Sequence, residues 1–288
     1  MQAKAAIQIV HGLSEHAERY GRLAQALTSS GYAVYASDLR GHGQTAKTAA
    51  DLGCFAERDG WGRCLDDLRR LNRHIASANP AKPIFLLGHS MGSTLARHLM
   101  ALHGDAPAGV VLSAAGGQPT FMATSGRLTT RLERLRLGRR GISKLLESLT
   151  FDAFNRRFKP ARTPFDWLSR DPAEVDKYIA DPLCGFPATV QLWIDLLDAW
   201  AWVSRPANLA GVPRELPILV ISGAHDPVSE GTRMLIPMLE QYRKAGLKKA
   251  EHKFYPEARH ELFNETNREE VTADLIAWLD AQNQNPKP

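Results

Sequence analysis

The chain has 288 residues, of which 44% are hydrophobic and 23% charged, and its formal net charge is +5. This composition is typical of a soluble globular protein with one α/β domain or a domain carrying an inserted subdomain, and it excludes a largely disordered chain. No apolar run approaches the ~20 residues that span a bilayer, and the first residues do not resemble a signal peptide. We therefore expect a cytoplasmic protein.

The positive charge is concentrated in one segment. Between Arg127 and Glu147 seven basic residues stand against two acidic ones, which accounts for the whole net charge of +5. A nucleic-acid-binding protein typically carries a broader basic face, so we expect no nucleic-acid partner.

The three cysteines form no recognisable motif. Cys54, Cys64 and Cys184 lack the spacing of zinc and redox sites. We expect free thiols in a reducing compartment, and neither a metal nor an organic cofactor.

Short apolar runs rich in β-branched residues alternate with helical stretches along the chain. This alternation predicts an α/β fold with a mostly parallel, twisted sheet flanked by helices. The predicted strands are Ala6–Val10, Ala33–Ser37, Ile84–Leu87, Gly109–Leu112, Ile218–Ser222 and His252–Tyr255. The predicted helices lie near Tyr20–Ser29, Trp61–Ala78, Ser93–Leu102, Thr232–Ala245 and Glu269–Ala281.

One long stretch, between Leu112 and Ile218, contains no obvious strand. A structureless loop of that length is implausible in a compact domain, and aromatic residues recur there at helical spacing. We predict a helical cap inserted at residues 118–206 into a core formed by residues 1–117 and 207–288.

The sequence Gly-His-Ser-Met-Gly at residues 88–92 lies between a predicted strand and a predicted helix. In this context Gly-x-Ser-x-Gly indicates a nucleophilic serine, Ser90, in a strained turn above the sheet. Gly88 and Gly92 would allow strand and helix to approach closely. The helix N-terminus would favour negative charge that develops beside the serine. We predict that Ser90 is the nucleophile of a hydrolase that forms an acyl-enzyme.

A serine hydroxyl needs a base, usually a histidine that a carboxylate orients. In this kind of fold the chain order is serine, then acid, then histidine. Asp226 and His260 each follow a predicted strand, and such strand-end loops gather at one edge of a parallel sheet. Ser90, Asp226 and His260 are therefore the predicted triad.

Several nearby residues compete for these roles. His225 precedes the predicted acid and lies in the wrong loop to be the base. Glu257 and Glu261 flank His260, and we expect both to be solvated at the surface. We expect the side chain of His89 to point away from Ser90 and to be structural.

An oxyanion hole requires two backbone N–H groups. The N–H of Met91 follows the nucleophile, and that of Leu13 lies in the loop after the first predicted strand. We predict both as oxyanion donors, and we expect His11 and His16 to shape the loop.

Four motifs in order resemble the monoacylglycerol lipase and lysophospholipase branch of the α/β-hydrolases, which overlaps domains labelled serine aminopeptidase-like. They are Val10–Tyr20 (VHGLSEHAERY), Asp38–Gly43 (DLRGHG), Gly88–Gly92 (GHSMG) and Ala258–Glu265 (ARHELFNE). The cap stretch Asp181–Phe186 (DPLCGF) also resembles bacterial lysophospholipases.

The resemblance implies an eight-stranded sheet, a helical lid and hydrolysis of fatty-acid esters of glycerol. It places Ser90, Asp226 and His260 at the triad, and Leu13 and Met91 at the oxyanion hole. Asp38 and His42 match a family motif outside the triad, so we expect them to organise a loop. Relatives usually carry two further strands before the one that leads to His-Gly, so we expect either a sheet shortened at one edge or a late start site.

The basic segment predicts an amphipathic helix. Leu128, Leu132 and Leu135 recur at helical spacing between arginines. We favour a lid helix that packs these leucines on the core, and the alternative is a helix that contacts anionic membranes. Gly138 and Gly141 would interrupt it.

The predicted function is hydrolysis of carboxylic esters of glycerol lipids, monoacylglycerol or lysophospholipid, without a cofactor. Alternatives stay open: the same triad could act as an aminopeptidase or an acyltransferase, or the fold could serve as a non-catalytic binding module. A dehalogenase is disfavoured because it needs Asp where Ser90 stands.

Overall fold

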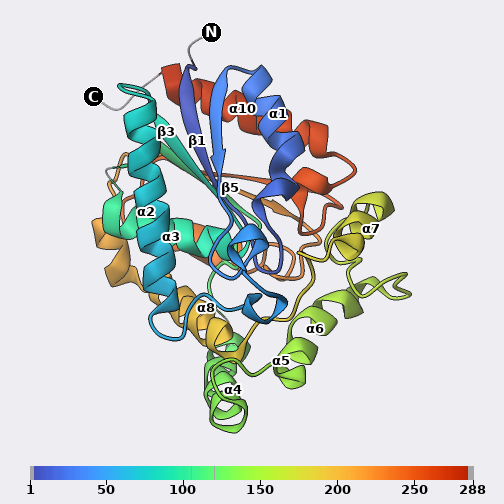
Figure 1. Cartoon of the computed structure of the whole chain (residues 1–288). Helices are drawn as coiled ribbons and strands as arrows, with labels where there is room; N and C mark the ends of the chain where they lie inside the picture. The colour runs from blue at the N-terminus through green and yellow to red at the C-terminus, as the bar shows by residue number, and fades with distance from the viewer. Residues whose placement is uncertain (1–2, 105, 120, 285–288) are drawn as a thin grey trace.

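A computed structural model describes residues 3–104, 106–119 and 121–284 of the chain. Its strands form one sheet in the order β2-β1-β3-β4-β5-β6, and every neighbouring pair is parallel (Figure 1). The strands are β1 (Ala5–Val10), β2 (Tyr32–Ala36), β3 (Ile84–His89), β4 (Gly109–Ser113), β5 (Ile218–Gly223) and β6 (Ala250–Tyr255). Each predicted strand is therefore present, within a residue or two of its predicted bounds.

The sheet of the described residues has six strands, so the expectation of eight is wrong for this part of the chain. Strand β2 forms one edge and pairs with β1 alone. After the buried Tyr32, the remaining residues of β2 are partly or fully exposed, as suits an edge strand.

Helices cover both faces of the sheet. Those outside the predicted cap are α1 (Gly21–Ser29), α2 (Gly60–Ala78), α3 (Met91–His103), α9 (Leu235–Lys244) and α10 (Arg268–Gln284). Residues of α2, α3 and α9 pack in one core and those of α1 and α10 in another, on opposite faces (Figure 1). Neighbouring residues of β3 alternate between them, because Leu86 faces the first core and Leu87 the second. No helix within the described residues has both the length and the apolar character to cross a membrane.

The chain between β4 and β5 is helical, as predicted. It contains α4 (Phe121–Leu137), α5 (Lys144–Leu149), α6 (Phe151–Asn155), α7 (Pro172–Ala180) and α8 (Val190–Val203). Helix α8 packs on α3 of the core, and α4 packs on α8 and projects at the end of the molecule (Figure 1). The exact bounds of a cap at residues 118–206 remain a prediction.

The orientation of α4 contradicts the favoured prediction. Its leucines face solvent: Leu128 is 64% exposed, Leu132 57% and Leu135 86%. The helix instead buries Thr130 and Glu133. In this orientation Arg127 and Arg131 both pair with Asp198 of α8. Within α4 itself, Arg136 pairs with Glu133. The helix ends at Leu137, and Gly138 follows with a φ of 75°, a conformation that favours glycine after a helix.

Candidate active site

Ser90 occupies the turn between β3 and α3, with φ 53° and ψ −117°. The flanking glycines are required there by close packing. A Cβ on Gly88 would lie 2.3 Å from the carbonyl oxygen of Gly92, and one on Gly92 would lie 2.1 Å from that of Val10. Only glycine permits this approach, so the turn has the tight geometry that the motif predicts. It leaves Ser90 partly exposed at the N-terminus of α3.

Asp226 and His260 meet although they follow different strands, β5 and β6. The Nδ1 of His260 lies 3.0 Å from both Oδ1 and Oδ2 of Asp226. Asp226 is fully buried and His260 is 3% exposed. Oδ1 of Asp226 also accepts a 2.9 Å hydrogen bond from the N–H of Val228, which helps to fix the carboxylate.

Burial disfavours the charged form of His260, but the Asp226 carboxylate and its hydrogen bond outweigh this penalty. As a result the pKa of His260 is raised above its usual 6.5. The imidazole is also held by rings on two sides, with that of Trp167 at 5.0 Å and that of His89 at 4.9 Å between centroids. The orientation of His260 is therefore determined by both polar and aromatic contacts.

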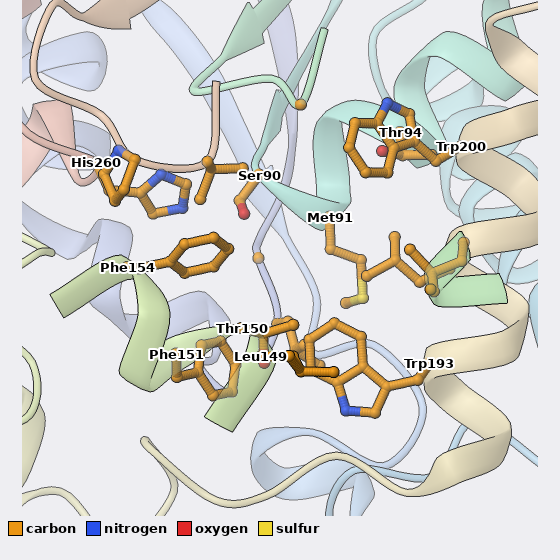
Figure 2. A pocket seen from close by; sticks show the side chains of 18 of the residues that line it. Ser90, Met91, Thr94, Leu149, Thr150, Phe151, Phe154, Trp193, Trp200 and His260 are labelled. Atoms are coloured by element: carbon orange, nitrogen blue, oxygen red, sulfur yellow. The ribbon is translucent and has the colours of Figure 1, made fainter. Parts of the chain in front are cut away.

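Ser90 and His260 line one cavity of about 340 Å³. Most of its wall is apolar and comes from α5, α6 and α8 together with Met91 (Figure 2). The apolar lining includes Leu149, Phe151, Phe154, Trp193 and Trp200. Near His260 the wall becomes polar, with Glu15, Tyr178 and Glu261. The cavity is thus amphipathic, and the predicted nucleophile lies in its wall.

The loop after β1 carries Leu13, the predicted oxyanion donor. Two hydrogen bonds of the His11 ring stabilise this loop. His11 donates from Nδ1 to the carbonyl of Gly12 at 2.8 Å and accepts at Nε2 from the N–H of Leu39 at 2.9 Å. Burial lowers the pKa of His11 to about 4, so it is neutral at pH 7 and Nε2 can accept. His11 therefore shapes the loop, as predicted.

A buried polar network beside the cavity was not predicted from the sequence. Glu15 accepts hydrogen bonds from the N–H of Gly12 at 2.5 Å and from the hydroxyl of Tyr20 at 2.9 Å. Burial, reinforced by the charge of Glu261, raises the pKa of Glu15 to about 7, and Arg19 opposes this rise. Except for Glu261, these residues belong to the motif at Val10–Tyr20, but the motif does not reveal that they pack together.

The prediction that Glu261 is solvated is wrong. Glu261 is 5% exposed and accepts a 2.5 Å hydrogen bond from Arg19. The reason is tertiary: the N–H of Glu261 donates to the carbonyl of Leu168 at 2.7 Å, which brings residue 261 against the segment between α6 and α7. Glu257, by contrast, is exposed, as predicted.

The remaining motif residues have structural surroundings. Asp38 accepts from the N–H of Ala17 at 2.9 Å and of Gln44 at 2.7 Å, so it organises two loops as expected. His42 is fully buried, and burial lowers its pKa to about 3. His225 is exposed and lies 4.0 Å from Glu257, away from the base position. His89 lies in the cavity wall, where burial holds its pKa well below 6.5.

The family model described as serine aminopeptidase, S33, a group of hydrolases, matches residues 1–267 of the chain. The chain belongs to this family. It is 30% identical to human monoglyceride lipase, over 92% of this chain and 81% of the human protein. It is 29% identical to the monoacylglycerol lipase of Mycolicibacterium smegmatis, over 96% of this chain and 88% of that protein.

A solved structure supports the same placement within the α/β-hydrolases. A thermostable carboxyl esterase from Bacillus coagulans, in complex with glycerol, superposes with a TM-score of 0.89. The two chains are 27% identical, and the match covers 98% of this chain and 91% of the esterase. The predicted fold class and the resemblance to the monoacylglycerol lipase branch are confirmed.

Proposed function

We propose that this hydrolase cleaves carboxylic esters of glycerol lipids, monoacylglycerol or lysophospholipid, with Ser90, His260 and Asp226 as its triad. The observation that carries the proposal is the buried pair of Asp226 and His260, of which His260 lines the same cavity as Ser90. A serine at a strained turn, a base and an orienting carboxylate are the groups that acyl transfer requires.

The proposed reaction has two halves. Ser90 Oγ attacks the ester carbonyl while Nε2 of His260 takes its proton, and Asp226 holds the Nδ1–H and stabilises the imidazolium. The N–H groups of Leu13 and Met91 stabilise the oxyanion. His260 then protonates the leaving alcohol. In the second half His260 activates a water molecule, which releases the fatty acid and regenerates Ser90.

The division of the cavity supports an amphiphilic substrate. An acyl chain would lie along the apolar wall of Leu149, Phe151 and Trp193, where burial of apolar surface favours binding. The polar groups at Glu15 and Tyr178 would face the hydroxyl groups of a glycerol head. Relatives named monoglyceride lipase, and a phospholipase from Bacillus subtilis, support this class of substrate.

The decisive variant is Ser90→Ala. We expect hydrolysis of short p-nitrophenyl esters to fall at least about 10⁴-fold, with an unchanged melting temperature. Activity equal to that of the wild type would overturn the mechanism. A panel of monoacylglycerols and lysophospholipids then identifies the preferred head group.

Three further assays distinguish the alternative functions. A fluorophosphonate probe that labels the wild type but not Ser90→Ala excludes a non-catalytic binding module. Release of N-terminal residues from peptides would favour an aminopeptidase, and ester formation with added alcohols would favour an acyltransferase.

We also propose that α4 contacts anionic membranes that supply the substrate. The exposed leucines, Leu128, Leu132 and Leu135, form an apolar stripe that no described part of the chain covers. Arginines on the same helix would attract anionic head groups. The adjoining residues Ser125, Gly126 and Thr129 line the cavity, so a lipid that enters at α4 would reach it directly.

A further inference from the structure

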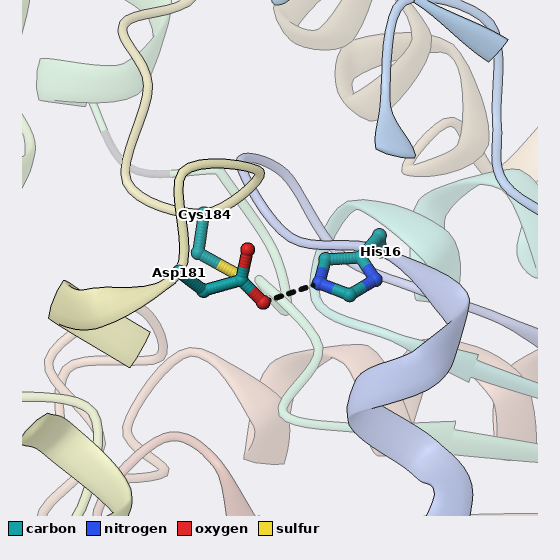
Figure 3. Close-up of side chains that lie close together, drawn as sticks. All are labelled: His16, Asp181 and Cys184. Carbon is teal, nitrogen blue, oxygen red and sulfur yellow. Dashed lines mark hydrogen bonds and ion pairs between the residues drawn. The ribbon is translucent and has the colours of Figure 1, made fainter. Parts of the chain in front are cut away.

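Three side chains with metal-binding atoms converge outside the lining of the cavity that contains Ser90. Figure 3 shows the three together. They are His16, from the segment after β1, and Asp181 and Cys184, from the turn between α7 and α8. One ligand atom of each lies within 4.8 Å of the others, and Nε2 of His16 is 2.8 Å from Oδ2 of Asp181. Nothing in the proposed ester hydrolysis uses these three groups.

The turn holds two of these groups in fixed relative positions. Oδ1 of Asp181 accepts a 2.8 Å hydrogen bond from the N–H of Leu183, which leaves Oδ2 directed at His16. The N–H of Cys184 donates to the carbonyl of Asp181 at 3.0 Å. A carboxylate fixed by such an outer contact is a better metal ligand than a free one, because it loses less orientational freedom when the ion binds.

The turn is also fixed against the segment that carries His16. The hydroxyl of Ser14 donates to the carbonyl of Phe186 at 2.7 Å, and the N–H of Gly185 donates to the carbonyl of Ser14 at 2.9 Å. The three ligands, although they come from distant parts of the sequence, are therefore held in one place before any ion binds.

We propose that His16, Asp181 and Cys184 bind a thiophilic divalent cation, of which Zn²⁺ is the representative. An imidazole nitrogen, a carboxylate oxygen and a thiolate sulfur are a ligand set that zinc accepts, with a fourth position left for water. On binding, Nε2 of His16 coordinates and its proton resides on Nδ1, while the thiol of Cys184 releases its proton to solvent. Movements of about 1 Å bring the three atoms to the ~2.0–2.3 Å of zinc–ligand bonds.

Access and charge both suit a cation. A surface cavity of about 290 Å³ is lined by His16 and Asp181, and provides a path for the ion and room for its water. The side chain of His16 is 7% exposed and that of Asp181 29%, so the ligands are largely shielded. The lining of this cavity also carries three basic residues, Arg19, Arg22 and Lys177, and two further carboxylates, Glu18 and Glu174. Arg19 pairs with Glu261, and Arg22 and Lys177 both pair with Glu174. The Asp181 carboxylate and the Cys184 thiolate would then neutralise a divalent ion.

The test uses Co²⁺ as a coloured substitute for Zn²⁺, added to the full chain kept reduced. We expect a sulfur-to-cobalt charge-transfer band that saturates at one ion per chain and disappears when Zn²⁺ is added. Because the ion binds the folded chain, it should also raise the melting temperature. Cys184→Ser should abolish the band. Asp181→Asn should weaken binding by at least the roughly 10- to 100-fold that loss of even an outer contact costs.

Matched controls exclude other sites. Cys54→Ser removes another buried thiol, and Asp176→Asn removes an exposed carboxylate of the neighbouring α7. Both should leave the band unchanged. The proposal is overturned if the wild type shows no charge-transfer band, or if the band persists in Cys184→Ser. If Cys184→Ser does not fold, Asp181→Asn decides, because unchanged binding in that variant also overturns the proposal.

Discussion

His260 directs its Nδ1 at the fully buried Asp226, 3.0 Å from each carboxylate oxygen, although the two residues lie 34 positions apart in the sequence. The contact determines which nitrogen of His260 carries the proton and which is free to accept one.

Asp226→Asn tests the orienting role of the carboxylate. Asparagine has a similar shape but is uncharged, and its amide NH₂ can favour the wrong tautomer of His260. We expect kcat for ester hydrolysis to fall by about 10⁴-fold, the loss typical of this change in a triad, with little change in melting temperature. His225→Gln, at the exposed neighbour, serves as the control and should retain full activity. A loss of less than tenfold in Asp226→Asn would contradict the proposed triad.

The pH profile of kcat/KM tests the protonation state of His260. The base must be neutral to take the proton of Ser90, and its pKa is raised above 6.5 by Asp226 despite burial. Activity should therefore fall as the pH decreases through this raised pKa and should persist on the alkaline side. Since Glu15 also titrates near pH 7, the same profile is measured in Glu15→Gln. In this variant the fall of kcat/KM at acidic pH should remain. If it disappears, the titrating group is Glu15 and not His260.

Glu15→Gln has a separate, pH-dependent effect on stability. The folded state raises the pKa of Glu15 from 4.5 to about 7, so between these values the folded chain holds a proton that the unfolded chain has lost. The stability of the wild type then decreases with rising pH through this window. Glutamine can still accept from Gly12 and Tyr20 but never ionises.

The free energy of unfolding of Glu15→Gln, relative to the wild type, should therefore increase between pH 5 and pH 8, by up to roughly 3 kcal/mol. Chemical denaturation at several pH values measures it. The exposed Glu257→Gln is the control and should show a flat difference. A flat difference for Glu15→Gln would show that Glu15 is not buried as a neutral acid.

Replacing Leu128, Leu132 and Leu135 together by serine tests the exposed face of α4. Because all three are exposed, each should change the free energy of unfolding by less than about 0.5 kcal/mol. Hydrolysis of a soluble short ester should be unchanged, whereas hydrolysis of monoacylglycerol in anionic vesicles should fall several-fold. Leu95→Ala, in the buried core, should cost about 2–5 kcal/mol. A large loss of stability in the triple variant would mean that the leucines pack on the protein.

Much of the fold and of the candidate site could be predicted because it depends on short-range patterns. The apolar run before residue 88, the glycines on each side of Ser90 and the helical stretch after it specify a strand, a tight turn and a helix within a few residues. The parallel arrangement then places Asp226 and His260 at the same edge as Ser90, since all three follow the carboxyl ends of parallel strands of one sheet, β3, β5 and β6.

The face that α4 presents could not be predicted in this way. The spacing of the leucines shows that α4 has an apolar face. The spacing alone does not show whether that face packs on the protein or faces a membrane. The packing of α4 on α8 decides it, because that packing buries Thr130 and Glu133 and leaves the leucines exposed. Arg127 and Arg131 pair with Asp198 of α8 in this arrangement. Similarly, glutamate is usually found at the surface, but Glu261 is buried where its N–H meets the carbonyl of Leu168 and its carboxylate pairs with Arg19.

The sequence by itself determined the family, the order of strands and helices and the residues expected to perform acyl transfer, because each is encoded in local backbone geometry and in the order of motifs. Only the tertiary structure decided which charges are buried, which face of α4 is exposed and that His16 meets Asp181, 165 residues further along the chain. These contacts depend on how distant segments pack, and the burial and charge that act on a side chain are properties of that packing.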